Sequence, residues 1–155
     1  MKINDEQKVS VLMQALEERY RSIHAIRERV QTVSIWILGI LLGTSGWLFQ
    51  SNIRFDMWYQ KLFLIVLLFI LWGTLRWFYF NDLQKGFNTQ RQVAATVEDL
   101  LGLFNKNVYG SVEPIYPKEW KSSGEKGSEG KFFDNTYNLI VVGFGVLSLV
   151  IVFLK

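Results

Sequence analysis

Residues 36–49 read WILGILLGTSGWLF, and this stretch decides the fold class because it combines a strongly apolar composition with three glycines. The block without charge around it extends over residues 33–49. A bilayer core of about 30 Å is crossed by roughly 17–25 apolar residues in helical form. The sequence therefore predicts that residues 33–49 form a transmembrane helix.

Two further apolar blocks follow along the chain of 155 residues, which is 50% hydrophobic and carries a net charge of +3. The only charged residues within 58–80 are Lys61 and Arg76, which lie near its two ends. Residues 137–154 contain no charged residue. Both blocks are long enough to cross a bilayer. We predict an all-α integral membrane protein with three transmembrane helices, the first two joined by a short external turn at residues 50–57.

The basic residues indicate an orientation, because Lys and Arg accumulate on the cytoplasmic side of a membrane. The 50–57 turn carries only Arg54, whereas Arg76, Lys85 and Arg91 lie at the far end of the second block or beyond it. The charged residues ahead of the first block do not resemble a signal peptide. We expect a cytoplasmic N-terminus, a cytoplasmic segment at 81–136 and an external C-terminus. The basic residues of the N-terminal segment are Lys2, Lys8, Arg19, Arg21, Arg27 and Arg29.

Heptad patterns mark the two cytoplasmic segments, residues 1–32 and 81–104. Only Arg19 and Gln90 interrupt them, and we expect Arg19 to extend its guanidinium to the surface. The patterns predict an antiparallel, coiled-coil-like stalk of two helices. We interpret the apolar positions as the buried face between these two helices. The alternative is that they form an interface with other chains. The apolar positions are Val9, Leu12, Leu16, Ile23, Ile26, Val30 and Val33, then Leu83, Phe87, Ala94, Val97, Leu101 and Phe104.

The segment at 105–136 is expected to return the chain to the membrane. Its first part, NKNVYGSVEPIYPKEW, offers the apolar side chains Ile115, Tyr116 and Trp120, and KSSGEKGSEGK has the composition of a flexible tether. Packing of this segment against its own stalk is favoured. Docking of a cytoplasmic partner protein on the three apolar residues is the alternative.

The glycines of the opening stretch, Gly39, Gly43 and Gly46, lie at i, i+4 and i+7 and so share one helix face. In lipid, small residues attract helices by letting backbones approach closely. The second span of the same subunit is the favoured partner, and a helix of another subunit is the alternative. The side chains expected to fill this face in the first case are Phe63, Leu67, Phe69 and Leu71.

Candidate chemistry is sparse, because the chain has no cysteine and a single histidine. Arg19 and His24 form an R-x4-H spacing that resembles the motif of HEPN-type ribonucleases, and a solvated helix face is the favoured interpretation of it. The carboxylates that could complete a metal site are interpreted as solvated stalk charges. We expect no enzymatic activity, no cofactor, no metal site and no nucleic-acid partner. The carboxylates in question are Glu17, Glu18, Glu98 and Asp99.

The apolar blocks contain no Asp, Glu or His, so they offer no residues for a proton relay. We expect Arg76 to reach the inner interface rather than line an anion path. Three helices of one subunit cannot enclose a pore, so conduction would need several copies. The candidate polar lining then consists of Thr44, Ser45, Arg76, Asn138 and Ser148.

The helix LEERYRSIHAIRERVQ, which leads into the first span, and the layout of residues 1–104 resemble small bacterial SLATT-type proteins. This resemblance implies a homo-oligomeric effector of the bacterial inner membrane that forms pores when a defence system triggers it. The third span departs from that two-span plan, and holins are a further comparison for small three-spanning proteins. We expect a non-enzymatic protein that perturbs or permeabilises the bilayer. The alternative is a membrane anchor or accessory subunit that recruits a cytoplasmic enzyme or a larger membrane complex.

Overall fold

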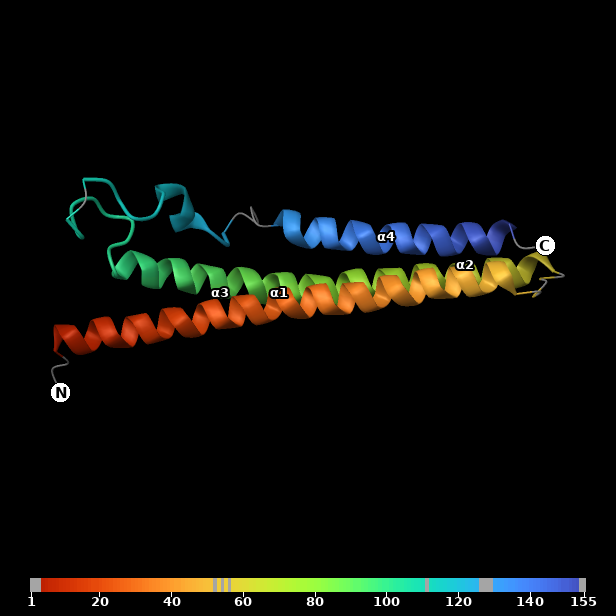
Figure 1. Ribbon diagram of the computed structural model, residues 1–155, viewed down its shortest axis with the longest axis horizontal. Coiled ribbons are helices and arrows are strands. Elements are labelled where there is room, and N and C mark those ends of the chain that lie inside the picture. Colours follow the sequence, from red (N-terminus) through yellow and green to blue (C-terminus); the bar gives the residue numbers. More distant parts are fainter. Residues whose placement is uncertain are drawn as a thin grey trace. The chain divides into compact units, whose positions relative to one another are not determined.

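The computed structural model describes residues 4–51, 53, 55, 57–110, 112–125 and 130–153, and over these residues it contains helices and turns but no strand. The all-α class is confirmed for this part of the chain. Three helical stretches are long and apolar enough to cross a membrane, namely Asp5–Gln50, Trp58–Leu100 and Lys131–Phe153. The elements in chain order are α1 (Asp5–Gln50), α2 (Trp58–Thr74), the π-helix η1 (Leu75–Phe80), α3 (Asn81–Leu100), the 3-10 helix η2 (Lys118–Ser122) and α4 (Gly130–Phe153) (Figure 1).

Contacts within the chain divide it into two compact units. The first, called the amphipathic unit, comprises Met1–Glu28 and Gln84–Gly130. The second, called the apolar unit, comprises Arg29–Leu83 and Lys131–Lys155. Helix α1 contributes to both units without a break.

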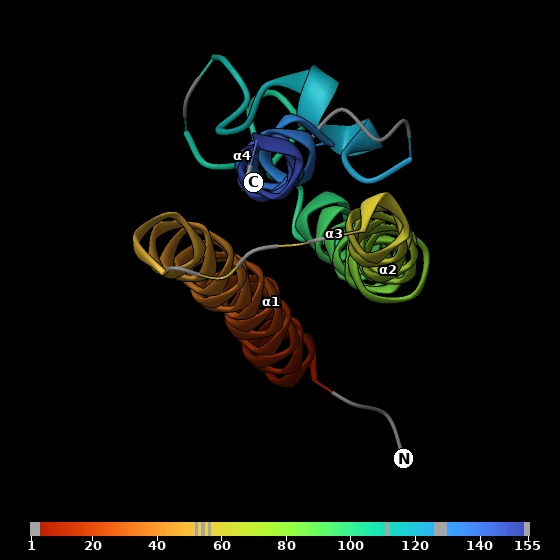
Figure 2. The same cartoon turned by 90° about the vertical axis from the view of Figure 1, so that its right-hand side faces the viewer.

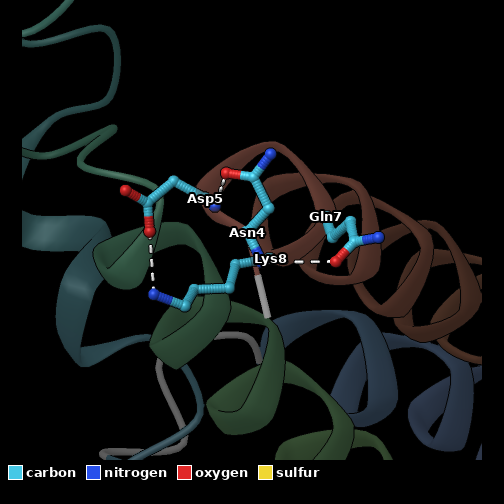
Figure 3. Close-up of polar contacts among 4 residues, drawn as sticks. All are labelled: Asn4, Asp5, Gln7 and Lys8. Carbon is cyan, nitrogen blue, oxygen red and sulfur yellow. Dashed lines mark hydrogen bonds and ion pairs between the residues drawn. The ribbon is translucent and has the colours of Figure 1, made fainter. Parts of the chain in front are cut away.

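Helix α1 begins at a polar cap that the sequence provides (Figure 3). The amide of Asp5 donates to Oδ1 of Asn4 at 2.7 Å, and the amide of Asn4 donates to Oε1 of Gln7 at 3.2 Å. Gln7 is the third helical residue, so its reach back to the residue before the helix is one half of a capping box. Lys8 adds an ion pair to Asp5 at 2.8 Å. These bonds satisfy backbone donors that a helix start leaves open.

Helix α3 ends at Leu100 rather than at Phe104, because Gly102 takes a left-handed conformation with φ +78°. The amide of Leu103 donates to the carbonyl of Glu98 at 3.1 Å, and the amide of Gly102 donates to that of Asp99 at 2.9 Å. This pair of bonds is the Schellman arrangement that closes helix C-termini at a glycine. The chain therefore turns away from the helix axis at Gly102.

In the amphipathic unit, α1 and α3 contact each other with opposite sequence directions. The Arg27 guanidinium lies 5.2 Å from the centre of the Phe87 ring, and Tyr20 donates to Glu98 farther along α3. Most apolar heptad positions of this unit are buried, although Val9 is exposed and Leu12 is half-buried. The buried heptad residues are Leu16, Ile23, Phe87, Ala94, Val97, Leu101 and Phe104.

In the apolar unit, α4 contacts both α1 and α2, and Figure 2 shows the three helices end on. Helices α2 and α4 run antiparallel, because Lys61 bonds to the Val152 carbonyl at one end and Arg76 faces Asp134 at the other. Helix α4 presents a buried row to the unit, and α1 does the same, whereas residues 58–74 of α2 include no buried residue. The buried rows are Val30, Ser34, Leu41, Ser45 and Leu48 on α1, and Phe133, Ile140, Phe144, Leu147 and Ile151 on α4.

The boundaries differ from the sequence expectation at two further points. Helix α4 begins at Gly130 rather than at Tyr137, so Phe133 belongs to the helix and is buried. The turn of η1 widens at Leu75–Phe80, where the amide of Asn81 donates to the carbonyl of Arg76, five residues back. Lys2 and Arg54, on which part of the predicted orientation rests, lie outside the described residues.

Candidate functional site

The glycine face of α1, formed by Gly39, Gly43 and Gly46, is open. A Cβ added at any of these three positions would meet no neighbouring atom of the described residues within 4 Å, apart from the helix's own backbone. All three glycines are exposed. The described residues therefore leave this face accessible to a further helix.

The second span does not fill this face in the structure. Its large side chains remain exposed, and Phe63 and Phe69 expose 63% and 65% of their surface. Leu67 and Leu71 are exposed as well. The favoured intramolecular interpretation of the glycines therefore finds no contact that supports it among the described residues, and the intermolecular alternative remains a prediction.

The close helix approach in the apolar unit occurs instead at Gly143 of α4. A Cβ added there would lie 2.9 Å from Cδ1 of Leu38 and 3.1 Å from Cδ1 of Leu41. These separations are shorter than van der Waals contact, so only glycine fits without movement of the leucines. Sequence reasoning missed Gly143, although the small residues Gly143 and Gly145 stand out within the apolar block of α4.

The candidate polar lining is distributed over different surroundings. Ser45 is buried, and its hydroxyl donates to the Leu41 carbonyl at 2.7 Å within the same helix, which satisfies the hydroxyl locally. Thr44 is half-buried and Asn138 is exposed. Ser148 lines a groove between α2 and α4. The structure therefore does not gather these side chains at one place.

Arg76 lies in η1 and faces α4. Its guanidinium carbon is 4.4 Å from the centre of the Tyr137 ring, and its Nη2 is 4.0 Å from Oδ1 of Asp134. The Tyr137 ring also contacts the rings of Trp72 and Phe80, at 6.2 Å and 5.8 Å between centroids. Such a ring holds a cation by its negative face. Arg76 is therefore fixed on an aromatic surface at the end of the apolar unit that also contains Asp134.

A polar network around the buried Glu98 joins α1 to α3 in the amphipathic unit, and its α1 member, Tyr20, is partly exposed. Glu98 is fully buried, Arg91 donates to its Oε1 at 3.0 Å, and the Tyr20 hydroxyl donates to the same oxygen. Oε2 of Glu98 is buried and has no hydrogen-bond partner among the described residues. Burial, followed by the hydrogen bond to Glu98, raises the pKa of Tyr20 well above its ordinary value. The network therefore holds a proton on Tyr20 and a charge pair between Arg91 and Glu98.

This network corrects one expectation from the sequence, since Glu98 is not a solvated charge. The chain after Gly102 folds back along α3, which covers a second side of that helix. Gln92 Nε2 donates to the Gly124 carbonyl at 3.0 Å, Lys121 pairs with Asp99 at 2.8 Å, and the Tyr116 amide donates to the Leu103 carbonyl at 3.0 Å. A heptad pattern for two helices contains no information about this third layer. Glu17 and Glu18 are exposed, as expected.

The two polar interruptions of the heptad patterns meet each other. Nη1 of Arg19 donates to Oε1 of Gln90 at 2.8 Å, and both residues are half-buried. Arg19 is thus engaged across the helix pair rather than extended to the surface. His24, the other half of the R-x4-H spacing, is exposed. Among the described residues, no group of three or more His, Asp or Glu side chains gathers in a way that could hold a metal ion.

The predicted docking residues lie on the returning segment of the amphipathic unit. Tyr116 is half-buried and its ring contacts that of Phe104 at 6.0 Å, so it helps to fix the segment to the unit. Ile115 and Trp120 remain about half exposed beside it. The structure thus supports packing of this segment on its own helices and leaves two apolar side chains open.

Comparisons of the chain with protein families, with curated proteins and with solved structures found no match. The functional proposal therefore depends on the residues and contacts described above.

Proposed function

We propose that the chain is a membrane protein whose apolar unit lies in the bilayer and assembles with further copies through the glycine face of α1. The observation that carries this proposal is the open space at Gly39, Gly43 and Gly46. In lipid, an apolar helix gains little from burial, and close backbone contact at small residues drives association. Glycine weakens a helix by about 1 kcal/mol relative to alanine, so three glycines on one open face favour a use for that face.

The function that we propose for the assembly is to perturb or permeabilise the bilayer without enzymatic chemistry. Helix α2 supports this proposal, because residues 58–74 include no fully buried residue and offer a second apolar surface. The distribution of basic residues supports a cytoplasmic amphipathic unit, standing as a two-helix stalk, with the C-terminus outside. The resemblance to SLATT-type proteins adds a triggered effector of the bacterial inner membrane as the biological form of this activity.

An anchor or accessory subunit is the second candidate function. The observation that favours it is the exposure of Ile115 and Trp120 next to the fixed Tyr116 ring, 5.5 Å from Trp120 between centroids. Aromatic side chains held in place on a surface are frequent anchors of protein interfaces. In this case the membrane helices hold a cytoplasmic partner at the bilayer, and the chain by itself leaves the bilayer intact.

The decisive experiment combines the mass of the solubilised complex with leakage from liposomes. Native mass spectrometry of the wild-type chain should give one discrete oligomer of at least about four copies, the minimum for enclosing a path with three helices each, and reconstituted protein should release a trapped dye. The double variant Gly39→Ile, Gly43→Ile should lose both properties while its helix content is retained. Gly73→Ile is the matched control, because Gly73 also has open space around it but lies on α2.

Each outcome separates the two candidate functions. An oligomer without leakage, together with capture of a cytoplasmic protein that Trp120→Ala abolishes, would favour the anchor. A wild-type monomer would overturn assembly through the glycine face. Unchanged oligomer mass in the double variant would show that assembly uses a different surface.

A further inference from the structure

Helices α2 and α4 enclose a groove of about 280 Å³ in the apolar unit. Gly145 contributes to the groove and has no atom of the described residues near the position of a Cβ, so the space above it is free. The only side-chain hydroxyl in the lining belongs to Ser148. The remaining lining residues are Leu68, Phe69, Trp72, Val141 and Phe144. This chemistry fits a hydrocarbon chain.

A cation lies one helical turn beyond the groove. Trp72 lines the groove, and its ring contacts Tyr137, on whose face the Arg76 guanidinium rests. Arg76 and Trp72 are four residues apart, which places them on the same side of the helix. The groove and the cation therefore form one continuous surface that is apolar at one end and basic at the other.

The guanidinium of Arg76 retains hydrogen-bonding capacity. Its Nη1 is buried and has no hydrogen-bond partner among the described residues. Its Nη2 is 4.0 Å from Asp134, whereas charge-assisted bonds of this kind measure about 2.7–2.9 Å. The side chain as a whole is about one-third exposed, so an oxyanion from outside can approach the exposed part of the guanidinium. Arginine recognises phosphate by charge-assisted N–H bonds, and Asp134 at 4.0 Å makes no bond of that length in this geometry.

We propose that this groove binds a glycerophospholipid, with one acyl chain against Trp72 and Gly145 and the phosphate at Arg76. The inference rests on the proposed placement of the apolar unit in a bilayer. A phospholipid is favoured over a helix of a second copy because the groove ends at a cation with unused donors, which an apolar helix would leave buried and unpaired. Basic sites between membrane helices on the cytoplasmic side are suited to lipid headgroups.

Native mass spectrometry of the full chain tests the proposal, with micelles that contain either phosphatidylglycerol or diacylglycerol carrying the same acyl chains. The wild-type chain should retain one phosphatidylglycerol per copy after the micelle is stripped, with about tenfold preference over diacylglycerol, the effect of one charge-assisted hydrogen bond. Arg76→Gln should remove the preference, and Arg76→Lys should keep part of it. Gly145→Leu should abolish retention of both lipids because its side chain fills the groove.

Gly73→Leu is the matched control, since Gly73 lies on α2, has open space and does not line the groove. If Gly145→Leu lowers helix content, Ser148→Leu fills the same groove from the same helix. Equal retention of both lipids by the wild-type chain would overturn the phosphate contact, and retention unchanged in both groove variants would overturn the groove. A change of oligomer mass in Gly145→Leu, without lipid on the wild type, would assign the groove to a second copy.

The same spectra distinguish this inference from the proposed oligomer. A wild-type monomer that retains one phosphatidylglycerol leaves the lipid site standing and overturns the assembly. A discrete oligomer that retains no lipid overturns the lipid site and leaves the assembly standing.

Discussion

In the amphipathic unit α1 meets α3 through Tyr20, Arg91 and Glu98, whereas in the apolar unit it meets α4 through Gly143 and two leucines. The first contact joins side chains by hydrogen bonds and an ion pair, and the second packs two leucine side chains against a glycine. A polar network has a large effect on stability because a broken member leaves a buried charge. A glycine contact depends on shape alone. The same helix is therefore held by polar contacts in one unit and by steric packing in the other.

The outer surfaces of the two units also differ in polarity. Large exposed apolar side chains are concentrated in the apolar unit, where Trp36, Phe49, Trp77, Phe78 and Phe153 each expose at least 70% of their surface. In the amphipathic unit, charged residues such as Glu17 and Arg21 cover the outside and pair with each other at 3.0 Å. The comparison indicates one unit suited to water and one suited to lipid.

The largest expected effect comes from breaking the polar network with Arg91→Met. Glu98 then stays buried without its cation, which should cost about 3–5 kcal/mol of local stability. Hydrogen exchange of α3 amides in the solubilised full chain measures the loss, as an acceleration of about 100-fold or more. The double variant Arg91→Met, Glu98→Leu should recover most of it, because no buried charge remains.

Arg29→Met is the control for this variant, since Arg29 is exposed and should change exchange little. Equal exchange in Arg91→Met and Arg29→Met would show that the network does not hold α3. The contrast between a polar and a purely steric contact would then be lost.

The next effect tests the steric contact in the apolar unit. Gly143→Leu would force its side chain into Leu38 and Leu41, and overpacking of this kind costs about 1–3 kcal/mol. Thermal unfolding followed by circular dichroism in detergent should show a lower midpoint than the wild type. Gly145→Leu has free space and should leave the midpoint unchanged or raise it, because leucine is the better helix former. Identical midpoints for both variants would contradict close contact at Gly143.

Tyr20→Phe removes one member of the network while keeping the ring, and should cost about 1 kcal/mol at neutral pH. Its pH dependence is more informative. The pKa of Tyr20 is raised in the folded chain, so the folded state binds this proton more tightly than the unfolded state. The resulting stability is fully present below pH 10, the ordinary tyrosine pKa, and falls as the pH rises above it.

The measurement is the absorbance of tyrosinate at 295 nm, recorded for both proteins as the pH rises. Tyr20 should not ionise where ordinary tyrosines do, so the wild-type and Tyr20→Phe curves should coincide through that range. A wild-type curve with one additional tyrosine titrating near pH 10 would show that the Tyr20 hydroxyl is solvated, and the polar description of this contact would fail.

The smallest effect belongs to the exposed ion pair between Lys121 and Asp99. Lys121→Ala should change the stability of the amphipathic unit by about 0–1 kcal/mol, because water screens a pair that is half exposed. Thermal unfolding at low and high salt should show that the small difference vanishes when salt is added. A loss comparable to that of Arg91→Met would mean that the returning segment, rather than the α1–α3 network, holds the unit together.

Most of the helical layout was accessible from the sequence, because apolar blocks and heptads report directly on helix length and on one buried face. Leu16, Ile23, Val97 and Leu101, predicted as packing residues, are buried. The register drifts by one residue along α1, so that Ser34 rather than Val33 is buried. A straight helix has 3.6 residues per turn, and a strict heptad of 3.5 falls out of phase with it.

The polar network of Tyr20, Arg91 and Glu98 could not be predicted from the sequence in this way. Arg91 and Glu98 are buried although they lie beside the predicted stripe of α3, and the segment at 116–125 bonds to their neighbours Gln92 and Asp99. Gly124 allows this approach, with φ +87° and a hypothetical Cβ only 2.6 Å from the Asn88 carbonyl oxygen. The apolar periodicity of a helix does not predict whether a loop will fold back and cover another side of that helix. The widened turn of η1 has no signal in the sequence that we can identify.

The absence of buried residues in α2 also bears on the order in which the apolar unit can be completed during synthesis. The core partner of Leu38 and Leu41 is Gly143, which the ribosome reaches about a hundred residues later. Until α4 emerges, α1 lacks the partner of Leu38 and Leu41. Long sequence separations of this kind slow folding and prolong the exposure of unsatisfied surfaces. If the apolar unit enters a bilayer as proposed, a newly made chain passes through a stage with only α1 and α2, in which insertion machinery, lipid or neighbouring copies are the available partners.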